Sequence, residues 1–117
     1  MPLLFLLLFI FISFFLPSAA NAQTGNTGSC ADCNRTNGLD ALDNVTTGDY
    51  NSAFGAYAML YTTTGSNNAG LGNRALIFNT TGAENSGVGS YALEANTTGN
   101  NNAALGYRTL TDNTSGV

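Results

Sequence analysis

The chain has 117 residues and a formal net charge of −4, with only three cationic residues and no histidine. So few cationic side chains cannot neutralise a phosphate backbone, which excludes nucleic acid as a partner. Without histidine, and with acidic residues that do not recur from one repeat to the next, we expect no catalytic site, no metal site and no cofactor. Serine and threonine have no base beside them that would make them nucleophiles.

The first 22 residues, MPLLFLLLFIFISFFLPSAANA, form an apolar run followed by small residues. This pattern is typical of a secretory signal peptide, although no Lys or Arg precedes the run. The run from Leu3 to Leu16 is also short for a membrane span. An uncleaved anchor is the alternative. We expect a secreted or cell-surface protein that begins at Gln23 and has no membrane span once the signal is removed.

Residues 23–37 are expected to form an N-terminal cap or linker that contains the sequence SCADCN. In an oxidising compartment the simplest interpretation of Cys30 and Cys33 is a local disulfide. A redox motif would need a thioredoxin-like context, and a zinc site would need two further ligands. Bridges between subunits remain an alternative.

Residues 38–117 repeat a unit of 17 residues, roughly G-x-x-A-L-x-x-N-T-T-G-x-x-N-x-A-h, in which h is a large apolar residue. A fixed period of this kind indicates a repeat architecture. The recurring glycines are Gly38, Gly55, Gly72, Gly89 and Gly106, and Gly48, Gly65, Gly82, Gly99 and Gly116. The recurring apolar residues are Leu42, Met59, Leu76, Leu93 and Leu110, and Phe54, Leu71, Val88 and Leu105.

Seventeen residues are too few for a helical hairpin repeat, and the frequent glycines disfavour long helices. The unit therefore predicts an all-β fold, a parallel β-solenoid with coils stacked about 4.8 Å apart. We expect two short strands and two turns in each coil, with the NTTG glycine at positive φ and both apolar columns inside. Such an interior is thin, so association of several chains along their apolar stripes, most naturally as a trimer, would stabilise it.

Stacking places like residues over one another. The asparagines Asn51, Asn68, Asn85 and Asn102 should form a structural ladder in which each amide bonds to the next. Tyr57, Arg74, Tyr91 and Arg108 share one column and follow Asp40. This column is either a surface ladder with cation–π contacts or a ligand face. The N-x-S/T sequons at Asn34, Asn44, Asn79, Asn96 and Asn113 are interpreted as turn chemistry, with glycosylation as the alternative.

The stretch GNRALIFNTTGAENSGVGSYALEANTTGNNNAALGYRTLTDNTSG resembles the head repeats of bacterial trimeric autotransporter adhesins. It is more similar still to the G-Y-x-A-L-x-x-N-T-T-G-x-x-N-T-A-h repeats of long bacterial surface proteins and tail-fibre-like proteins. The resemblance covers about residues 38–117. It implies a left-handed parallel β-roll, a homotrimer, and display on the cell surface. The adhesin heads usually have a shorter unit. The sequence contains no stalk, barrel anchor or chaperone domain, which is what we expect of a fragment that is incomplete at its C-terminus.

The sequence thus predicts a non-catalytic, extracellular repeat module of a bacterial adhesin or fibre. Its expected ligands are a host surface, a matrix protein or a glycan, and its expected association with the outer membrane would depend on a missing C-terminal part. Two alternatives stay open. Recurring threonine pairs suggest an ice-binding solenoid, although they fall at an expected corner and ice binding favours a flat face. The third hypothesis is a passive structural spacer.

Overall fold

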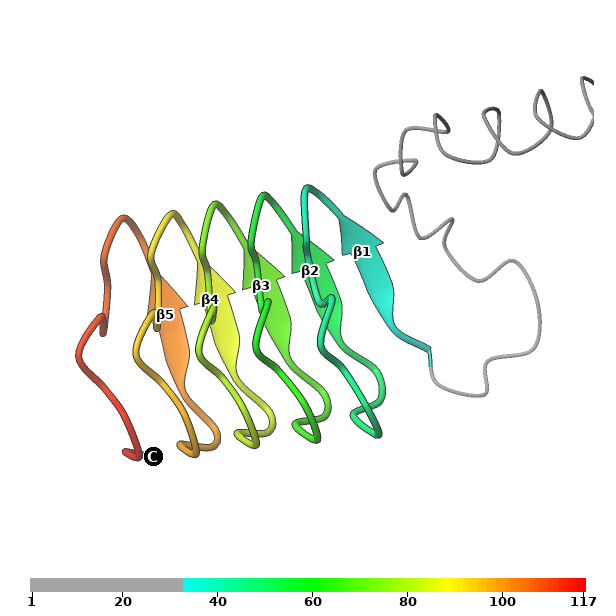
Figure 1. Cartoon of the computed structure of the whole chain (residues 1–117). Helices are drawn as coiled ribbons and strands as arrows, with labels where there is room; N and C mark the ends of the chain where they lie inside the picture. Colours follow the sequence, from blue (N-terminus) through cyan, green and yellow to red (C-terminus); the bar gives the residue numbers. More distant parts are fainter. Residues whose placement is uncertain (1–32) are drawn as a thin grey trace, which may run out of the picture.

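The computed structural model describes residues 33–117, and these form a parallel β-solenoid (Figure 1). The expected signal peptide, residues 1–22, lies outside the described residues. One strand in each coil contributes to a single five-stranded sheet in the order β1-β2-β3-β4-β5. The strands are β1 (Arg35–Asn37), β2 (Ser52–Phe54), β3 (Ala69–Leu71), β4 (Ser86–Val88) and β5 (Ala103–Leu105). Within residues 33–117 no helix is long and apolar enough to cross a membrane.

Every strand pairs with the next in parallel at an offset of one repeat, so that Ser52 lies beside Ala69, and Phe54 beside Leu71. The 17-residue period predicted from the sequence is therefore the length of one coil. The strand β1 follows the same register, because Arg35 pairs with Ser52. It does so although the sequence placed residues 35–37 in the N-terminal cap.

The expectation of two strands in each coil was wrong. Beyond the sheet, the chain turns through bends that are held by hydrogen bonds to neighbouring coils. In the third coil, the backbone N–H of Arg74 donates to Ala56 in the preceding coil at 3.0 Å, whereas that of Leu76 donates to Ala92 in the following coil at 2.9 Å. Both residues have left-handed backbone conformations, with φ of 57° and 54°. A side chain in this conformation costs about 1–2 kcal/mol, and the bonds to both neighbours offset that cost.

The two columns of recurring glycines are required for two different physical reasons. Gly72 has a φ of 139°, and a Cβ atom there would lie 2.6 Å from the carbonyl carbon of Gly89. The NTTG glycines were expected at positive φ, and this was wrong, since among the described glycines positive φ occurs only in the other column. At Gly82 the constraint is close approach, because a Cβ atom would lie 2.5 Å from the carbonyl oxygen of Gly99.

The interior is as thin as the sequence predicted. Its large apolar members are Met59, Leu76 and Leu93, each of which has no exposed surface, together with Leu42. Against them pack the central residues of the strands, such as Ala53 and Ala104, and the alanines that precede the leucines. The facing strand residues are Ala or Gly, and against them packs one large side chain of each coil, from Leu42 to Leu93. Ile77 is buried as well but lies outside this cluster.

The second apolar column was expected inside, and this was wrong. Phe54, Leu71, Val88 and Leu105 project from the outer face of the sheet, with exposed fractions of 43%, 41%, 37% and 80%. The reason is strand alternation. In β2 to β5 the buried residue is the middle one of the three, so its neighbours point outward. The outer sheet face therefore carries an exposed apolar stripe, defined by these four residues.

Candidate functional site

The corner beside the NTTG sequence contains a continuous ladder of buried asparagines. The side-chain Nδ2 of Asn68 donates to Oδ1 of Asn51 at 3.0 Å, and that of Asn85 donates to Oδ1 of Asn68 at 3.2 Å. Asn102 continues the series to Asn85 at 3.0 Å. The ladder also includes Asn34, whose Oδ1 accepts the backbone N–H of Asn51. That residue lies 17 positions before Asn51 and was missed because it precedes the recognised repeats.

A second asparagine ladder lies beside the first and was not predicted. Nδ2 of Asn96 donates to Oδ1 of Asn79 at 2.6 Å, and both side chains are fully buried. Each also donates to the carbonyl of the glycine three residues later, Gly82 or Gly99. Their recurrence in the NTTG sequence was visible, but it was interpreted as turn chemistry alone. Burial prevents a glycan on either side chain in the folded protein, so these two sequons are parts of the interior.

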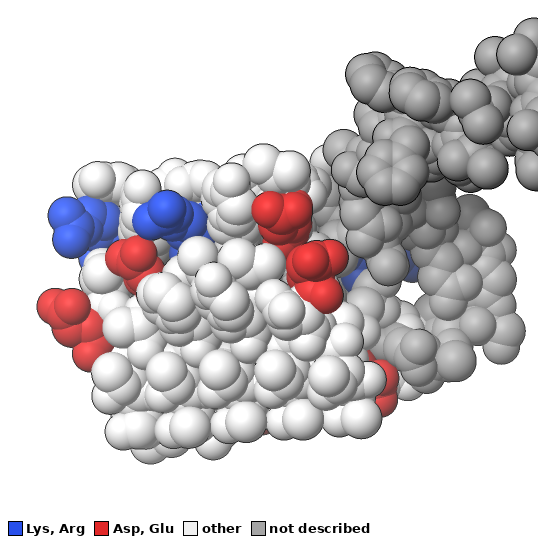
Figure 2. All heavy atoms as spheres, in the orientation of Figure 1, with Lys and Arg blue, Asp and Glu red and all other residues white. Residues whose placement is uncertain are grey.

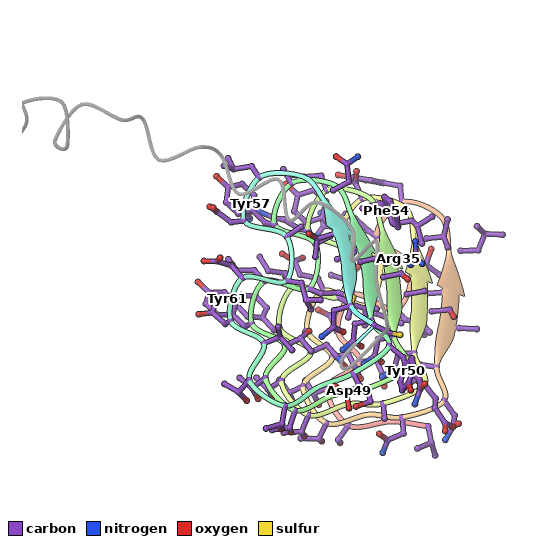
Figure 3. All side chains as sticks on the ribbon, turned by 90° about the vertical axis from the view of Figure 1, so that its right-hand side faces the viewer. Arg35, Asp49, Tyr50, Phe54, Tyr57 and Tyr61 are labelled. Atoms are coloured by element: carbon purple, nitrogen blue, oxygen red, sulfur yellow. The ribbon has the colours of Figure 1, made fainter. Side chains whose placement is uncertain are left out.

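The column of Tyr57, Arg74, Tyr91 and Arg108 lies on the side of the coil opposite the sheet. Figure 3 shows Tyr57 and Tyr61 projecting from that side, whereas Phe54 and Arg35 lie at the sheet. The guanidinium carbon of Arg74 lies 5.7 Å from the ring centroid of Tyr91, the cation–π contact that the sequence suggested. Among residues 33–117 neither arginine of this column forms an ion pair.

Two further residues, Tyr107 and Glu94, lie beside this column and were not predicted to belong to it. Tyr107 meets Tyr91 edge to face, with ring centroids 6.1 Å apart and an interplanar angle of 89°. Together with Glu94 and Arg108 these rings line an open hollow of about 310 Å³. Tyr107 directly precedes the Tyr/Arg column, in a position that holds small or polar residues in the three preceding coils, so periodicity alone gave no signal for it.

The charged groups of this face are unevenly placed along the rod. Figure 2 shows basic side chains near the C-terminal end of the face and acidic ones both beside them and towards the N-terminal end. The same face carries a parallel aromatic stack between Tyr61 and Phe78, whose centroids are 5.4 Å apart. These two residues are also one repeat apart, a pattern that the sequence contained and that was overlooked. We call the side opposite the sheet the tyrosine face.

The predicted cysteine pair lies at the boundary of the described residues. Cys33 takes part in a disulfide, and Cys30, the other half of the proposed local pair, lies outside the described residues. In the part of the chain that the structure describes, no group of three or more acidic, cysteine or histidine residues could hold a metal ion.

The fold and its stacked columns define a repeat protein of the parallel β-solenoid class. Comparison with known proteins found no protein-family model, no curated protein and no solved structure that matches the chain. The surface of the solenoid is therefore the guide to its function.

Proposed function

We propose that the chain is a non-catalytic, extracellular repeat module of a bacterial cell-surface adhesin or fibre. The observation that supports this most directly is the tyrosine face, where Tyr57, Arg74, Tyr91 and Arg108 recur at every coil on a hydrogen-bonded framework. Tyrosine and arginine are the side chains most often found at contact hot spots. A ligand that spans several coils would add many weak contacts, which raises avidity without any single strong site.

We further propose that the module is a homotrimer whose apolar stripes meet at a central axis. The stripe of Phe54, Leu71, Val88 and Leu105 is continuous over four coils and contains no charged residue. Contact between three such stripes would bury the largest exposed apolar side chains of the sheet. Because the stripe and the tyrosine face lie on opposite sides (Figure 3), this assembly would leave the ligand face outside.

The oligomer is tested by light scattering on the full-length chain and on two matched variants. Leu71→Asp places a carboxylate in the middle of the stripe, and Thr81→Asp places the same group at an exposed corner position. We expect the wild type and Thr81→Asp to be trimers, and Leu71→Asp to be a monomer. A monomeric wild type, or a Leu71→Asp variant that stays trimeric, would refute the proposed interface.

Ice binding has less support from the surface. The hydroxyl of the first threonine of each pair is occupied, since Thr63 Oγ1 donates to the carbonyl of Thr80 at 3.0 Å and Thr80 Oγ1 to that of Thr97 at 3.1 Å. In the pairs of the later coils only the second threonine is exposed, as at Thr64 and Thr81, whereas in the first pair Thr46 is exposed as well. The free hydroxyls therefore form a narrow row along a corner, whereas ice binding requires a flat array of several rows.

Binding is tested by applying the full-length protein to an array of glycans and matrix proteins, with thermal hysteresis measured on the same sample. We expect binding to at least one array component and no hysteresis. Clear hysteresis would establish the ice-binding alternative. A verified trimer that binds nothing on the array would contradict the adhesive function and leave a passive spacer.

A further inference from the structure

The hollow on the tyrosine face indicates one class of ligand. We propose that it is a subsite for an acidic sugar, a saccharide unit that carries a carboxylate. This inference rests on the proposed adhesive function and names the chemistry that the face recognises. The four lining side chains, Tyr91, Glu94, Tyr107 and Arg108, come from two successive coils, so the subsite exists only when the coils are stacked.

Of the two phenol rings in the lining, the exposed ring of Tyr107 is the surface that would pack against a sugar ring. The two rings stand nearly perpendicular, at 89°, with centroids 6.1 Å apart. Tyr107 is 71% exposed, so its ring is open to a ligand from solvent. An aromatic face supplies apolar contact area while the hydroxyl remains free for hydrogen bonds, a combination that suits a molecule with both C–H faces and hydroxyl groups. The hollow of about 310 Å³ lies at the small end of the range for ligand sites.

Arg108 is the group of the hollow that would bind an anion. Arg108 lines the hollow, and Arg74 lies over the ring of Tyr91 at 5.7 Å, while neither forms an ion pair within residues 33–117. Glu94 is the acidic group of the lining, so the lining holds one guanidinium group and one carboxylate, and Arg74 lies outside it. A guanidinium binds a carboxylate through two parallel N–H donors. The carboxylate of Glu94 can accept hydrogen bonds from sugar hydroxyls.

The backbone around the hollow favours a sugar over an acidic peptide. Extended peptides are usually held by main-chain hydrogen bonds to an open strand edge. Here the N–H of Tyr91 already donates to Asn73 at 2.9 Å, and that of Arg108 donates to Ser90 at 2.9 Å. The contacts that the hollow offers are therefore made by side chains, which bind the rings, hydroxyls and carboxylate of a saccharide.

The test is calorimetric titration of the full-length chain with a disaccharide that contains glucuronic acid, and with the same disaccharide as its neutral methyl ester. We expect the acid to bind about tenfold more tightly than the ester, because one charge-assisted contact is lost in the ester. Arg108→Gln should abolish this difference. Arg35→Gln removes the same charge from the sheet side of the coil and should preserve it. Circular dichroism verifies that both variants are folded.

Three results would overturn the inference: equal affinity for acid and ester, equal losses in Arg108→Gln and Arg35→Gln, or tighter binding of a short acidic peptide than of the acidic disaccharide. A protein that binds another array component but no acidic sugar refutes this inference and leaves the adhesive function standing. A protein that binds neither the disaccharide nor any array component refutes both.

Discussion

Thr62 occupies the one described position where the interior contains an unsatisfied polar atom. Its Oγ1 is buried and has no hydrogen-bond partner among the described residues. It lies in the column of the second asparagine ladder, one coil before Asn79, and replaces the amide found there. We predict that Thr62→Val, which keeps the shape of the side chain and removes the hydroxyl, stabilises the solenoid.

The expected gain follows from the cost of burying a hydroxyl without a partner. That cost is about 1–3 kcal/mol, so Thr62→Val should raise the free energy of unfolding by about 1–2 kcal/mol. Thr62→Ser is the matched control, because it keeps the hydroxyl and loses a methyl group. It should lower the free energy of unfolding by about 1 kcal/mol.

A third variant uses the geometry of the ladder. The carbonyls of Gly82 and Gly99 each accept two side-chain amides, whereas that of Gly65 accepts only the amide of Asn51. Thr62→Asn would supply the second donor to Gly65. It should be stabilising by about 1 kcal/mol, the usual net value of one hydrogen bond.

The assay is urea unfolding followed by circular dichroism, since the chain contains no tryptophan. With a slope of about 1 kcal/mol per molar urea, the midpoint should rise by roughly 1–2 M in Thr62→Val. A fall in the midpoint of Thr62→Val comparable to that of Thr62→Ser would show that the hydroxyl is satisfied, and the reasoning about this position would be refuted.

Two further predictions concern the framework. Asn68→Ala removes a side-chain amide that bonds to both neighbouring coils, so unfolding measurements should show a loss of about 3 kcal/mol. The exposed Thr81→Ala should change stability by less than about 0.5 kcal/mol. Equal effects of the two substitutions would contradict the ladder. Gly72→Ala combines strain at φ 139° with overlap of the next coil and should cost about 3 kcal/mol or more. In Gly106→Ala the added Cβ atom would meet only the hydroxyl of Thr109, at 3.0 Å, so the substitution should cost about 1–3 kcal/mol. A larger loss of stability at Gly106 than at Gly72 would argue against the stacking.

The sequence predicted the period, the parallel stacking and the burial of Leu42, Met59, Leu76 and Leu93, because each depends on what recurs at intervals of 17 residues. Leu110, the last member of the same column, was expected inside as well and is 46% exposed. It could not place the stripe of Phe54 and Leu71. In the sequence, an apolar column looks the same whether it faces the interior or a sheet surface. Which side it faces is determined by the small residue that precedes it in the strand. Ala53 and Gly70 occupy the inward position in their strands, which leaves no space there for a large side chain.

The tyrosine face was predictable in part. The alternation of Tyr57, Arg74, Tyr91 and Arg108 was visible, and it suggested the contact between Arg74 and Tyr91. The hollow was not predictable, because it joins residues from different columns of successive coils, which come together through the left-handed bends. These bends fall on residues such as Tyr91, with a φ of 59°, that no local sequence rule assigns to such a conformation.

The asparagine ladders have a consequence for how such a protein can change in length. Each amide is fixed by a partner one whole coil away, as Asn85 is by Asn68 and by Asn102. An insertion into the ladder that is not a whole number of 17-residue units would shift every later amide away from its partner. Duplication of a complete unit in the gene, by contrast, adds one rung and reproduces all existing bonds. The length of the rod can therefore change in evolution only by whole coils, each of which adds about 4.8 Å.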